Sequence, residues 1–553
     1  MLMRLKKLHF DRVLPKPEFL SRFAREEDGI LIVFGVYVFL IILVVAGIGV
    51  DLMRFERDRS LLQNTLDRAV LAAADLDQEL DPTEVVADYF DKAGMSDYLT
   101  SVTVDEGLSY RTVSGSATAD VDTKFMHMTG VDTLTAPASS TAEERIDGVE
   151  ISLVLDVSGS MNSNSKLSNL KTAARDFIDE MVANTEDGKL SISIIPYATQ
   201  VSAPTEFFQY FDVSSEHSYS NCINFESADF DETAMDLDQS WERTMHFDVW
   251  TYSDGRYDSP AALVDFPVCE ADDNREMLIM QKDADTLKDF ITNLSARGNT
   301  SIDVGMKWGT ALIDPEMNPV IVSMIGDGTV DADFAARPLE YDDSDILKVI
   351  VLMTDGKNTS QYYIDDDYRE DASDIWWNAD EEKYSVYDTG SDSYYWPHDD
   401  DWHDHAYGNQ GAVTYCKKYR WNGKCKKWGT IPPEPGEAFV LDYPELWART
   451  SMKENVREHY EPWSGSAWND WYYDVRHYVG SSTKNNRTKD ICDAAKEQQV
   501  IVYTIGFEAP ESGEAVLEDC ASSASHFFDV DGLAISDAFS SIASSIRKLR
   551  LTQ

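Results

Sequence analysis

An uninterrupted apolar segment near the start of the chain runs from Ile30 to Val50 and contains no charged residue. Its 21 residues are enough to cross the hydrocarbon core of a bilayer as one helix. The segment is longer than the core of a usual signal peptide, and 29 residues precede it. We therefore expect a retained membrane anchor, with a cleaved leader as the alternative.

Apolar residues continue at helical spacing beyond this segment, at Leu52, Phe55, Leu62, Leu66 and Val70. The pattern predicts that the helix extends past the membrane until Asp81-Pro82 breaks it. Short runs of alternating polarity follow, "SVTVDEG", "TVSGSATADVDT" and "LTAPASSTAEE", which indicate a small β unit. A hydrophobic helix followed by a small β unit is the arrangement of pilins, a comparison made at the level of fold alone.

Four later runs are apolar almost throughout, namely "EISLVLDVS", "KLSISIIPY", "KVIVLMTDG" and "QVIVYTIGF". Strands that are buried on both faces of a parallel sheet have this pattern. Helical periodicity lies between the runs, at Leu167, Leu170, Ala174, Phe177, Ile178 and Met181, and again after Leu533. The alternation predicts an α/β fold with a doubly wound, mostly parallel sheet and helices on both of its faces.

Two long stretches interrupt this alternation, at about 201–274 and 361–484. Both exceed ordinary connections, which predicts that each is an inserted subdomain or a functional excursion. The expected layout is a cytoplasmic segment at 1–29, a transmembrane helix at 30–50, a helix with a small β unit at 51–147, and an α/β domain at 148–553 that contains both insertions.

The chain is strongly acidic, with 99 Asp and Glu against 48 Lys and Arg and a net charge of −51. Such a surface repels the phosphates of nucleic acids, so we expect no nucleic-acid partner. The sequence contains neither a P-loop nor the glycine fingerprint of dinucleotide-binding domains, so no nucleotide is expected. It also lacks G-x-S-x-G and H-E-x-x-H motifs, which favours a protein that is not an enzyme.

Six cysteines, none in a C-x-x-C pair, favour disulfides over a zinc ribbon: Cys222, Cys269, Cys416, Cys425, Cys492 and Cys520. Six cysteines allow 15 pairings, and the sequence does not choose among them. We adopt nearest-neighbour pairing as an interpretation, because each pair then lies in its own segment.

The basic residues beside the apolar segment balance on its two sides, and only Arg4, Lys6 and Lys7 tilt the count toward a cytoplasmic N-terminus. The cysteines and the acidic bulk indicate the same orientation. We expect a single-pass protein of the cytoplasmic membrane with residues 51–553 outside it.

Three pieces of sequence each follow an expected strand or begin an expected helix: Asp156-x-Ser158-x-Ser160, Thr300 in "RGNTSID", and Asp355 in "VLMTDGKN". In doubly wound sheets, ligands bind beyond the carboxyl ends of the strands. Two carboxylates and three hydroxyls are hard oxygen ligands, which suit Mg²⁺ best and also Mn²⁺ or Ca²⁺. Each piece alone has a structural alternative, because Asp, Ser and Thr also cap helices and Asp-Gly also forms turns.

Together these pieces resemble the metal-ion-dependent adhesion site of von Willebrand factor A domains. The resemblance implies that Ser158, Ser160 and Thr300 bind the metal directly, and Asp156 and Asp355 directly or through water. "REEDGILIVFGVYVFLIILVVAGIGVDLMRFERDRSLLQNTLDRAVLAAA" is similar to the N-terminal segment of TadE/TadG-type proteins, and "CDAAKEQQVIVYTIGFE" and "CASSASHFFDV" are similar to TadG-type assembly proteins of the bacterial tight-adherence (Flp) pilus. That family context also implies a Cys492–Cys520 disulfide.

The resemblance implies a membrane-anchored pilus-assembly or adhesion protein that captures an acidic side chain of a pilus or envelope partner through a divalent metal. Two rivals stay open at this point: an envelope adhesin without a pilus role, and a metal-dependent hydrolase. In the second insertion, "WPHDDDWHDHAYG" allows a surface metal site, and the neighbouring aromatic residues allow a surface that binds a glycan or a protein. A solvated acidic loop and a small local core are the simpler interpretations.

Overall fold

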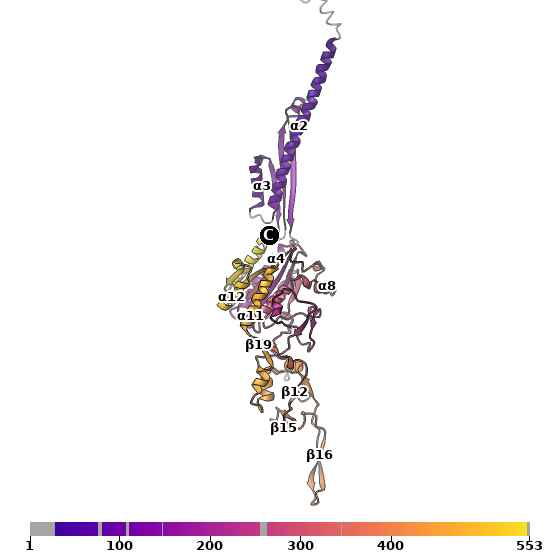
Figure 1. Ribbon diagram of the computed structural model, residues 1–553, viewed down its shortest axis with the longest axis vertical. Helices are drawn as coiled ribbons and strands as arrows, with labels where there is room; N and C mark the ends of the chain where they lie inside the picture. Colours follow the sequence, from indigo (N-terminus) through magenta and orange to yellow (C-terminus); the bar gives the residue numbers. More distant parts are fainter. Residues whose placement is uncertain are drawn as a thin grey trace, which may run out of the picture. The chain divides into compact units, whose positions relative to one another are not determined.

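The computed structural model describes residues 28–75, 80–106, 110–145, 148–254, 263–343 and 346–549. The chain divides into two compact units, and the boundary between them falls at Arg145. The smaller unit contains the N-terminal helix and a small sheet, and the larger unit contains the α/β core with both insertions. Figure 1 labels the elements of each unit.

The smaller unit is built on one long helix, α2 (Asp28–Ala74). The structure contains one helix that is long and apolar enough to cross a membrane, judged by length and composition over the described residues. Further along α2, the residues Leu62, Leu66, Val70 and Ala73 are buried. Their helical spacing makes one apolar face, and this face packs on a small sheet.

That sheet has three strands in the order β1 (Leu99–Glu106), β2 (Tyr110–Asp122) and β3 (Thr133–Arg145). The expected helix, β unit and continuation of the helix are therefore present. The predicted end of the helix is wrong, because α2 ends at Ala74. Asp81-Pro82 instead starts a second helix, α3 (Pro82–Lys92), since the Asp81 carboxylate accepts hydrogen bonds from the Thr83 and Glu84 amides.

The connection between β2 and β3 packs against α2 near the end of the predicted membrane segment. The Asp51 carboxylate accepts hydrogen bonds from the backbone amides of Lys124, Phe125 and Met126. The Phe125 ring lies so close to Gly47 that a Cβ there would come within 2.6 Å of it. The β2–β3 connection therefore contacts the helix at the last turns of its apolar part.

The core of the larger unit is a six-stranded sheet in the order β21-β20-β10-β4-β5-β9. Its strands are β4 (Gly148–Asp156), β5 (Leu190–Tyr197), β9 (Leu278–Gln281), β10 (Ile346–Thr354), β20 (Ile501–Phe507) and β21 (Phe527–Val530). All neighbouring pairs are parallel except β5 and β9. The strand order runs outward from β4 in both directions, so the order reverses between β4 and β10.

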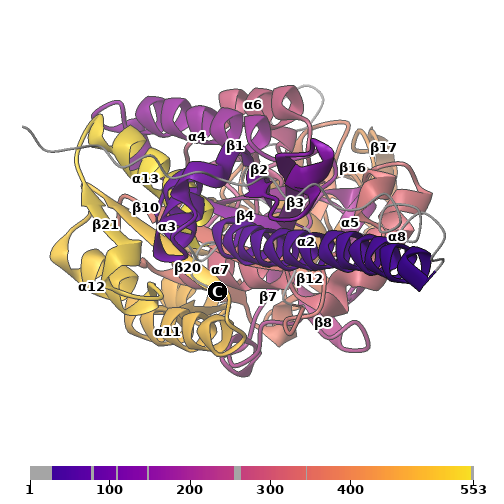
Figure 2. The same ribbon diagram turned by 90° about the horizontal axis from the view of Figure 1, so that it is seen from above.

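Helices cover both faces of this sheet, as Figure 2 shows. One face packs on α4 (Lys166–Ala183), α6 (Ala284–Asn293) and α13 (Ala534–Leu549). The other face packs on α7 (Ile302–Ala311), α8 (Asn318–Gly326), α11 (Ser481–Glu497) and α12 (Glu511–Cys520). The strands are apolar almost throughout because neither face reaches solvent.

The first insertion lies between β5 and β9 and has little regular structure. It contains α5 (Thr205–Phe208) and a small sheet of β6 (Asp212–Val213), β8 (Ser240–Arg243) and β7 (Ile223–Asn224). A disulfide joins Cys222 to Cys269 within it. A second disulfide, Cys492–Cys520, joins α11 to α12 in the core. The third, Cys416–Cys425, lies in the second insertion, so all three bridges pair nearest neighbours.

The second insertion, between β10 and α11, has its own five-stranded antiparallel sheet in the order β15-β14-β13-β12-β18. These strands are β12 (Ala372–Asn378), β13 (Lys383–Asp388), β14 (Ser393–Trp396), β15 (Asp401–His403) and β18 (Ala438–Asp442). Two further pairs are β11 (Gln361–Ile364) with β19 (Arg476–Val479), and β16 (Val413–Tyr419) with β17 (Cys425–Ile431). The helices α9 (Tyr443–Arg449) and α10 (Met452–Asn455) complete the insertion.

Candidate functional site

Asp156 is the last residue of β4. Its carboxylate accepts one hydrogen bond from the loop that follows β4 and one from the end of the neighbouring strand β10. The Ser158 amide donates to Asp156 Oδ1 at 2.7 Å. The hydroxyl of Thr354, the last residue of β10, donates to Asp156 Oδ2 at 2.5 Å. Because β4 and β10 are parallel neighbours, their carboxyl ends meet at the point where the strand order reverses.

A chain of short polar contacts links the two strand ends. The hydroxyl oxygens of Ser158 and Ser160 lie 3.0 Å apart. The Ser160 hydroxyl donates to Asp355 Oδ1 at 2.6 Å, although 195 residues separate the two in sequence. The fold thus brings together the first and third pieces that the sequence analysis singled out.

Thr300 belongs to a loop that reaches the same edge of the sheet. The Gly159 amide donates to the Gly298 carbonyl at 2.9 Å, and Gly298 has the left-handed backbone (φ 89°) that favours glycine. The Thr300 hydroxyl lies 3.8 Å from where a Cβ on Gly356 would stand. We call Asp156, Ser158, Ser160, Thr300 and Asp355 the switch-point cluster.

The capping alternatives for these residues do not hold in the structure. The helix after the first piece begins only at Lys166, and Ser158 flanks a short 3-10 turn without capping it by its side chain. The helix α7 begins at Ile302, so Ser301, and not Thr300, is its flanking residue. The hydroxyls of the cluster are therefore not used as helix caps.

The two carboxylates of the cluster repel each other in a buried place. Burial, and after it the charge of Asp355, raises the pKa of Asp156 to about 6. Over the described residues, no group of three or more His, Cys, Asp or Glu side chains is placed to hold a metal ion. The cluster instead offers two carboxylates and three hydroxyls, a donor set that fits a hard divalent cation such as Mg²⁺ or Mn²⁺.

A lysine that the sequence analysis missed already lies at the cluster. Lys166 Nζ donates to Asp355 Oδ2 at 3.0 Å and lies 3.7 Å from Glu508. Its side chain is only 9% exposed. Lys166 is in the first turn of α4, where the helix dipole disfavours a cation. A lysine in that position is the signal in the sequence that could have pointed to an acidic partner.

A second lysine donates hydrogen bonds to the backbone of the Thr300 loop. Lys484, on α11, is fully buried and donates to the Thr300 carbonyl at 2.8 Å, to the Ser301 hydroxyl at 2.5 Å and to the Thr359 carbonyl at 3.0 Å. Burial lowers the pKa of Lys484 to about 8. The nearest carboxylate, of Asp303, is 4.0 Å away. This lysine positions the loop without touching the hydroxyls of the cluster.

Three histidines of the second insertion, His398, His403 and His405, lie around the Trp396 ring, but they form no metal-binding group among the described residues. His403 stacks on Trp396 and pairs with Asp399, whereas His405 contacts Asp404 and Glu434. Two of the aromatic residues near this segment, Trp377 and Tyr395, are buried in the core of the insertion. His403 and His405 are thus bonded to nearby carboxylates, and part of the aromatic set forms a local core.

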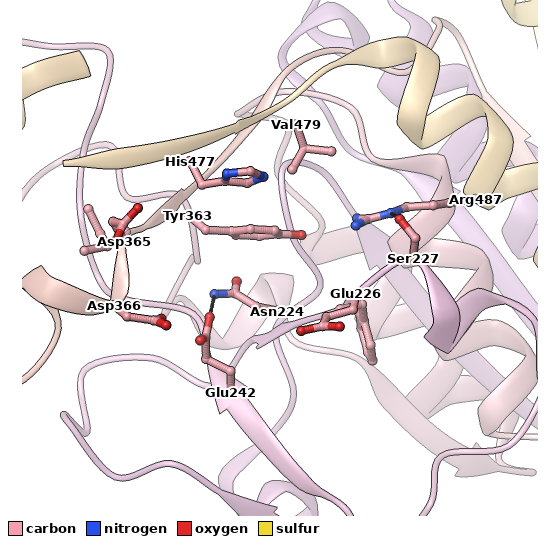
Figure 3. A pocket seen from close by; sticks show the side chains of 12 residues that line it. Asn224, Glu226, Ser227, Glu242, Tyr363, Asp365, Asp366, His477, Val479 and Arg487 are labelled. Carbon is pink, nitrogen blue, oxygen red and sulfur yellow. Dashed lines mark hydrogen bonds between the residues drawn. The ribbon is translucent and has the colours of Figure 1, made fainter. Parts of the chain in front are cut away.

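A cavity of about 400 Å³ lies where the two insertions meet α11. Figure 3 shows the Tyr363 hydroxyl pointing toward the guanidinium of Arg487, which lies one helical turn after Lys484. Both side chains are at least nine-tenths buried, and within the described chain neither the Tyr363 hydroxyl nor Arg487 Nη1 has a hydrogen-bond partner. Four carboxylates line the cavity as well, from Glu226, Glu242, Asp365 and Asp366. This cavity combines the buried guanidinium of Arg487 with four carboxylates. No motif in the sequence predicted it.

Comparison with known proteins connects one segment of the chain to a family. Residues 29–76, which correspond to most of α2, match the family model "Putative Flp pilus-assembly TadE/G-like". No curated protein matches the chain.

Several solved structures are similar to larger parts of the chain. One is the vWF domain of the type V pili tip protein Mfa5 from Porphyromonas gingivalis, with 15% identity over 72% of this chain and 95% of that chain, at a TM-score of 0.30. Another is the PilB minor pilin from Streptococcus sanguinis, with 13% identity over 82% and 78% of the two chains and a TM-score of 0.28. A third is the pilus adhesin SpaC from Lactobacillus rhamnosus GG, with 12% identity over 81% and 33%, at 0.30.

Proposed function

We propose that this chain is a membrane-anchored protein of a Flp/Tad-type pilus assembly or adhesion system. Its larger unit would act as a von Willebrand factor A-type binding module. The module would capture an acidic side chain of a pilus or envelope protein through a divalent cation at the switch-point cluster. Mg²⁺ is the cation that we favour, with Mn²⁺ and Ca²⁺ as substitutes.

One observation carries the proposal: two buried carboxylates and two serine hydroxyls from opposite parts of the sequence converge at the point where strand order reverses. Asp156 and Asp355 would neutralise a divalent cation, and Ser158, Ser160 and Thr300 would supply uncharged oxygens. A cation with only two protein charges around it keeps a strong attraction for a further carboxylate. The bound cation supplies that attraction, and the protein supplies the fixed oxygens.

The acidic surface explains why such a module would need a cation. With a net charge of −51, the chain repels an acidic partner unless a positive charge stands at the contact. Lys166 supplies part of that charge, but Glu508 and Asp355 both lie beside it. The N-terminal part of α2 would hold the protein in the cytoplasmic membrane of a bacterium, with the larger unit on the outer side. The match of residues 29–76 to the TadE/G-like model supports this placement.

The proposal is tested in cells whose own copy of the gene is deleted. Complementation with the wild-type chain should restore pili and should allow co-purification of a pilus component that EDTA releases. Complementation with Asp355→Ala should restore neither, whereas Asp176→Ala, which removes an exposed carboxylate of α4, should restore both. Normal pili in the Asp355→Ala strain would contradict the proposed role. Unchanged pili in the deletion strain itself would favour the envelope adhesin instead.

A further inference from the structure

The β16–β17 hairpin, residues 413–431, has a composition unlike the rest of the chain. It contains none of the 99 acidic residues but six of the 48 basic ones, Lys417, Lys418, Arg420, Lys424, Lys426 and Lys427. The stretch without any Asp or Glu extends from position 405 to position 433. In a protein of net charge −51, such a segment is a local reversal of the surface charge. We call residues 413–431 the basic hairpin.

The basic hairpin buries almost nothing. Every residue of its two strands is exposed except Cys416, Cys425 and Gly429, which are half-buried. Trp421, in the turn, is 99% exposed, and Tyr419 and Trp428 are about two-thirds exposed. Figure 1 shows the hairpin projecting beyond β15 and β12 of its own insertion. Exposed aromatic side chains of this size mark a contact surface.

The pairing register of the two strands places like charges opposite each other, which lowers the stability of the hairpin. Lys418 lies directly opposite Lys427, and like charges in that position destabilise a hairpin. An isolated two-stranded hairpin is only marginally stable, and the Cys416–Cys425 disulfide closes this one. A cation pair held in place by a covalent bridge suits an anionic ligand that relieves the repulsion.

The positions of the aromatic residues decide between kinds of anionic ligand. Tyr415 lies opposite Gly429 and shares its face, whereas Trp428 is the next residue along the strand and points to the other face. One nucleic-acid strand could not stack on both rings. A ribbon that enters a lipid headgroup layer by its tip is surrounded on both faces, and Trp, Tyr, Lys and Arg are the residues that such layers favour.

The hairpin is also long enough to hold its turn away from the negative charge of the rest of the chain. Seven residues of strand span about 24 Å at roughly 3.4 Å per residue. Charges in physiological salt are screened over about 8 Å. The turn with Trp421 can therefore meet a negatively charged surface while the acidic body remains several screening lengths away.

We propose that the basic hairpin binds an anionic lipid surface, with Trp421 entering the headgroup layer and the lysines pairing with lipid phosphates. This binding does not depend on the switch-point cluster. The anionic lipid would belong to a different membrane from the one that holds the N-terminal anchor.

The test uses the full chain, anchored in nanodiscs of neutral phosphatidylcholine, and measures its binding to separate immobilised vesicles. Vesicles with 30% phosphatidylglycerol (a composition of about one anionic lipid in three) should bind the protein, and pure phosphatidylcholine vesicles should not. Binding should weaken as salt rises. Lys418→Gln with Lys427→Gln should weaken it roughly thirty-fold, because each surface-bound lysine contributes about fivefold.

Matched controls separate the hairpin from charge and apolarity in general. Lys489→Gln with Lys496→Gln, on α11, changes the net charge equally and should leave vesicle binding unchanged. Trp421→Ser should weaken binding roughly tenfold, whereas Leu533→Ser, at another exposed apolar residue, should not. Equal binding to neutral vesicles, or unchanged binding in the two-lysine hairpin variant, would overturn the proposal. So would self-association without vesicles that the hairpin variant abolishes, because it would assign the hairpin to the acidic face of a second copy. Full displacement by a DNA oligonucleotide at concentrations that leave vesicles intact would assign it to nucleic acid.

Discussion

The switch-point cluster and the basic hairpin lie in the same compact unit and are built in opposite ways. The cluster collects residues from positions 156 to 355, buries all of them except the exposed Ser160, and orients them through the edge of a sheet. The basic hairpin takes all of its residues from one short segment and exposes nearly all of them. Function in the first depends on topology, because no short segment contains it. Function in the second depends on local composition and needs little from the rest of the fold.

The largest expected contrast between the two regions is in stability. Lys484→Met removes the donor for the Thr300 carbonyl, the Ser301 hydroxyl and the Thr359 carbonyl, and it leaves the buried Asp303 without its nearest cation. We expect a loss of about 3–5 kcal/mol in the free energy of unfolding. Trp421→Ser in the hairpin should change it by less than about 0.5 kcal/mol.

Tryptophan fluorescence during urea unfolding measures this contrast, because all 13 tryptophans lie at or beyond position 241 and so report on the larger unit. Lys489→Met is the matched control on the same helix. Lys489 is only half-buried and pairs with Asp519 at 3.1 Å, so its removal should cost at most about 1 kcal/mol. If Lys484→Met and Lys489→Met unfold at the same urea concentration, Lys484 does not support the loop.

A change of pH should alter Mg²⁺ binding at the switch-point cluster by about a factor of ten and leave lipid binding by the basic hairpin unchanged. Burial and the charge of Asp355 raise the pKa of Asp156 to about 6, so Asp156 binds a proton as the pH falls below that value. Because a metal needs the deprotonated carboxylate, Mg²⁺ affinity should fall roughly tenfold between pH 7 and pH 5. The basic hairpin has no carboxylate and no histidine, so its vesicle binding should stay level over the same range.

In the metal-free protein, the effect of Asp156 on folding stability has the opposite pH dependence to its effect on Mg²⁺ affinity. The raised pKa of Asp156 means that its contribution to stability is fully present at low pH and is lost as the pH rises through about 6. Mg²⁺ should therefore raise the unfolding temperature more at pH 7 than at pH 5. An equal rise at both pH values would show that Asp156 does not take part in binding.

Removing the lysine beside the cluster should strengthen metal binding. Lys166 competes for Asp355 Oδ2, which it contacts at 3.0 Å. Lys166→Gln should raise Mg²⁺ affinity about fivefold, the effect of one moderate ion pair. Lys171→Gln, further along α4 and bonded to the Thr292 carbonyl, is the control and should leave the affinity unchanged. A weaker affinity in Lys166→Gln would mean that this lysine supports the cluster.

The smallest effect is expected from the hairpin disulfide. Cys416→Ser with Cys425→Ser frees the two strands without touching the six-stranded sheet. We expect a two- to threefold loss of vesicle binding, from the added freedom of the hairpin, and no change in Mg²⁺ affinity. A loss of metal binding in this variant would show that the two regions are not independent.

Several features could be predicted from the sequence because a physical rule connects them to it. The apolar strands follow from burial on both faces, and the meeting of Asp156 with Asp355 follows from the rule that parallel strand ends share one edge. The roles of Lys166 and Lys484 do not follow, because each depends on which carboxylate or carbonyl the fold places beside it. The helix α3 was missed because Asp81-Pro82 signals a helix start as well as a break.

The basic hairpin was missed for a different reason. A net charge summed over 553 residues conceals a segment of the opposite sign. Its six basic residues all lie between positions 417 and 427, so a count of charge in short windows would have found them.

The most direct test of the central claim, a divalent cation at the switch-point cluster, is a calorimetric titration of the full chain in detergent with Mg²⁺ at pH 7. The wild type should bind one ion per chain. Ser158→Ala with Asp355→Ala should lose at least about a hundredfold in affinity. Ser163→Ala with Asp176→Ala removes the same two chemical groups outside the cluster and should bind as the wild type does. Equal Mg²⁺ affinity in the wild type and the Ser158/Asp355 variant would contradict the claim.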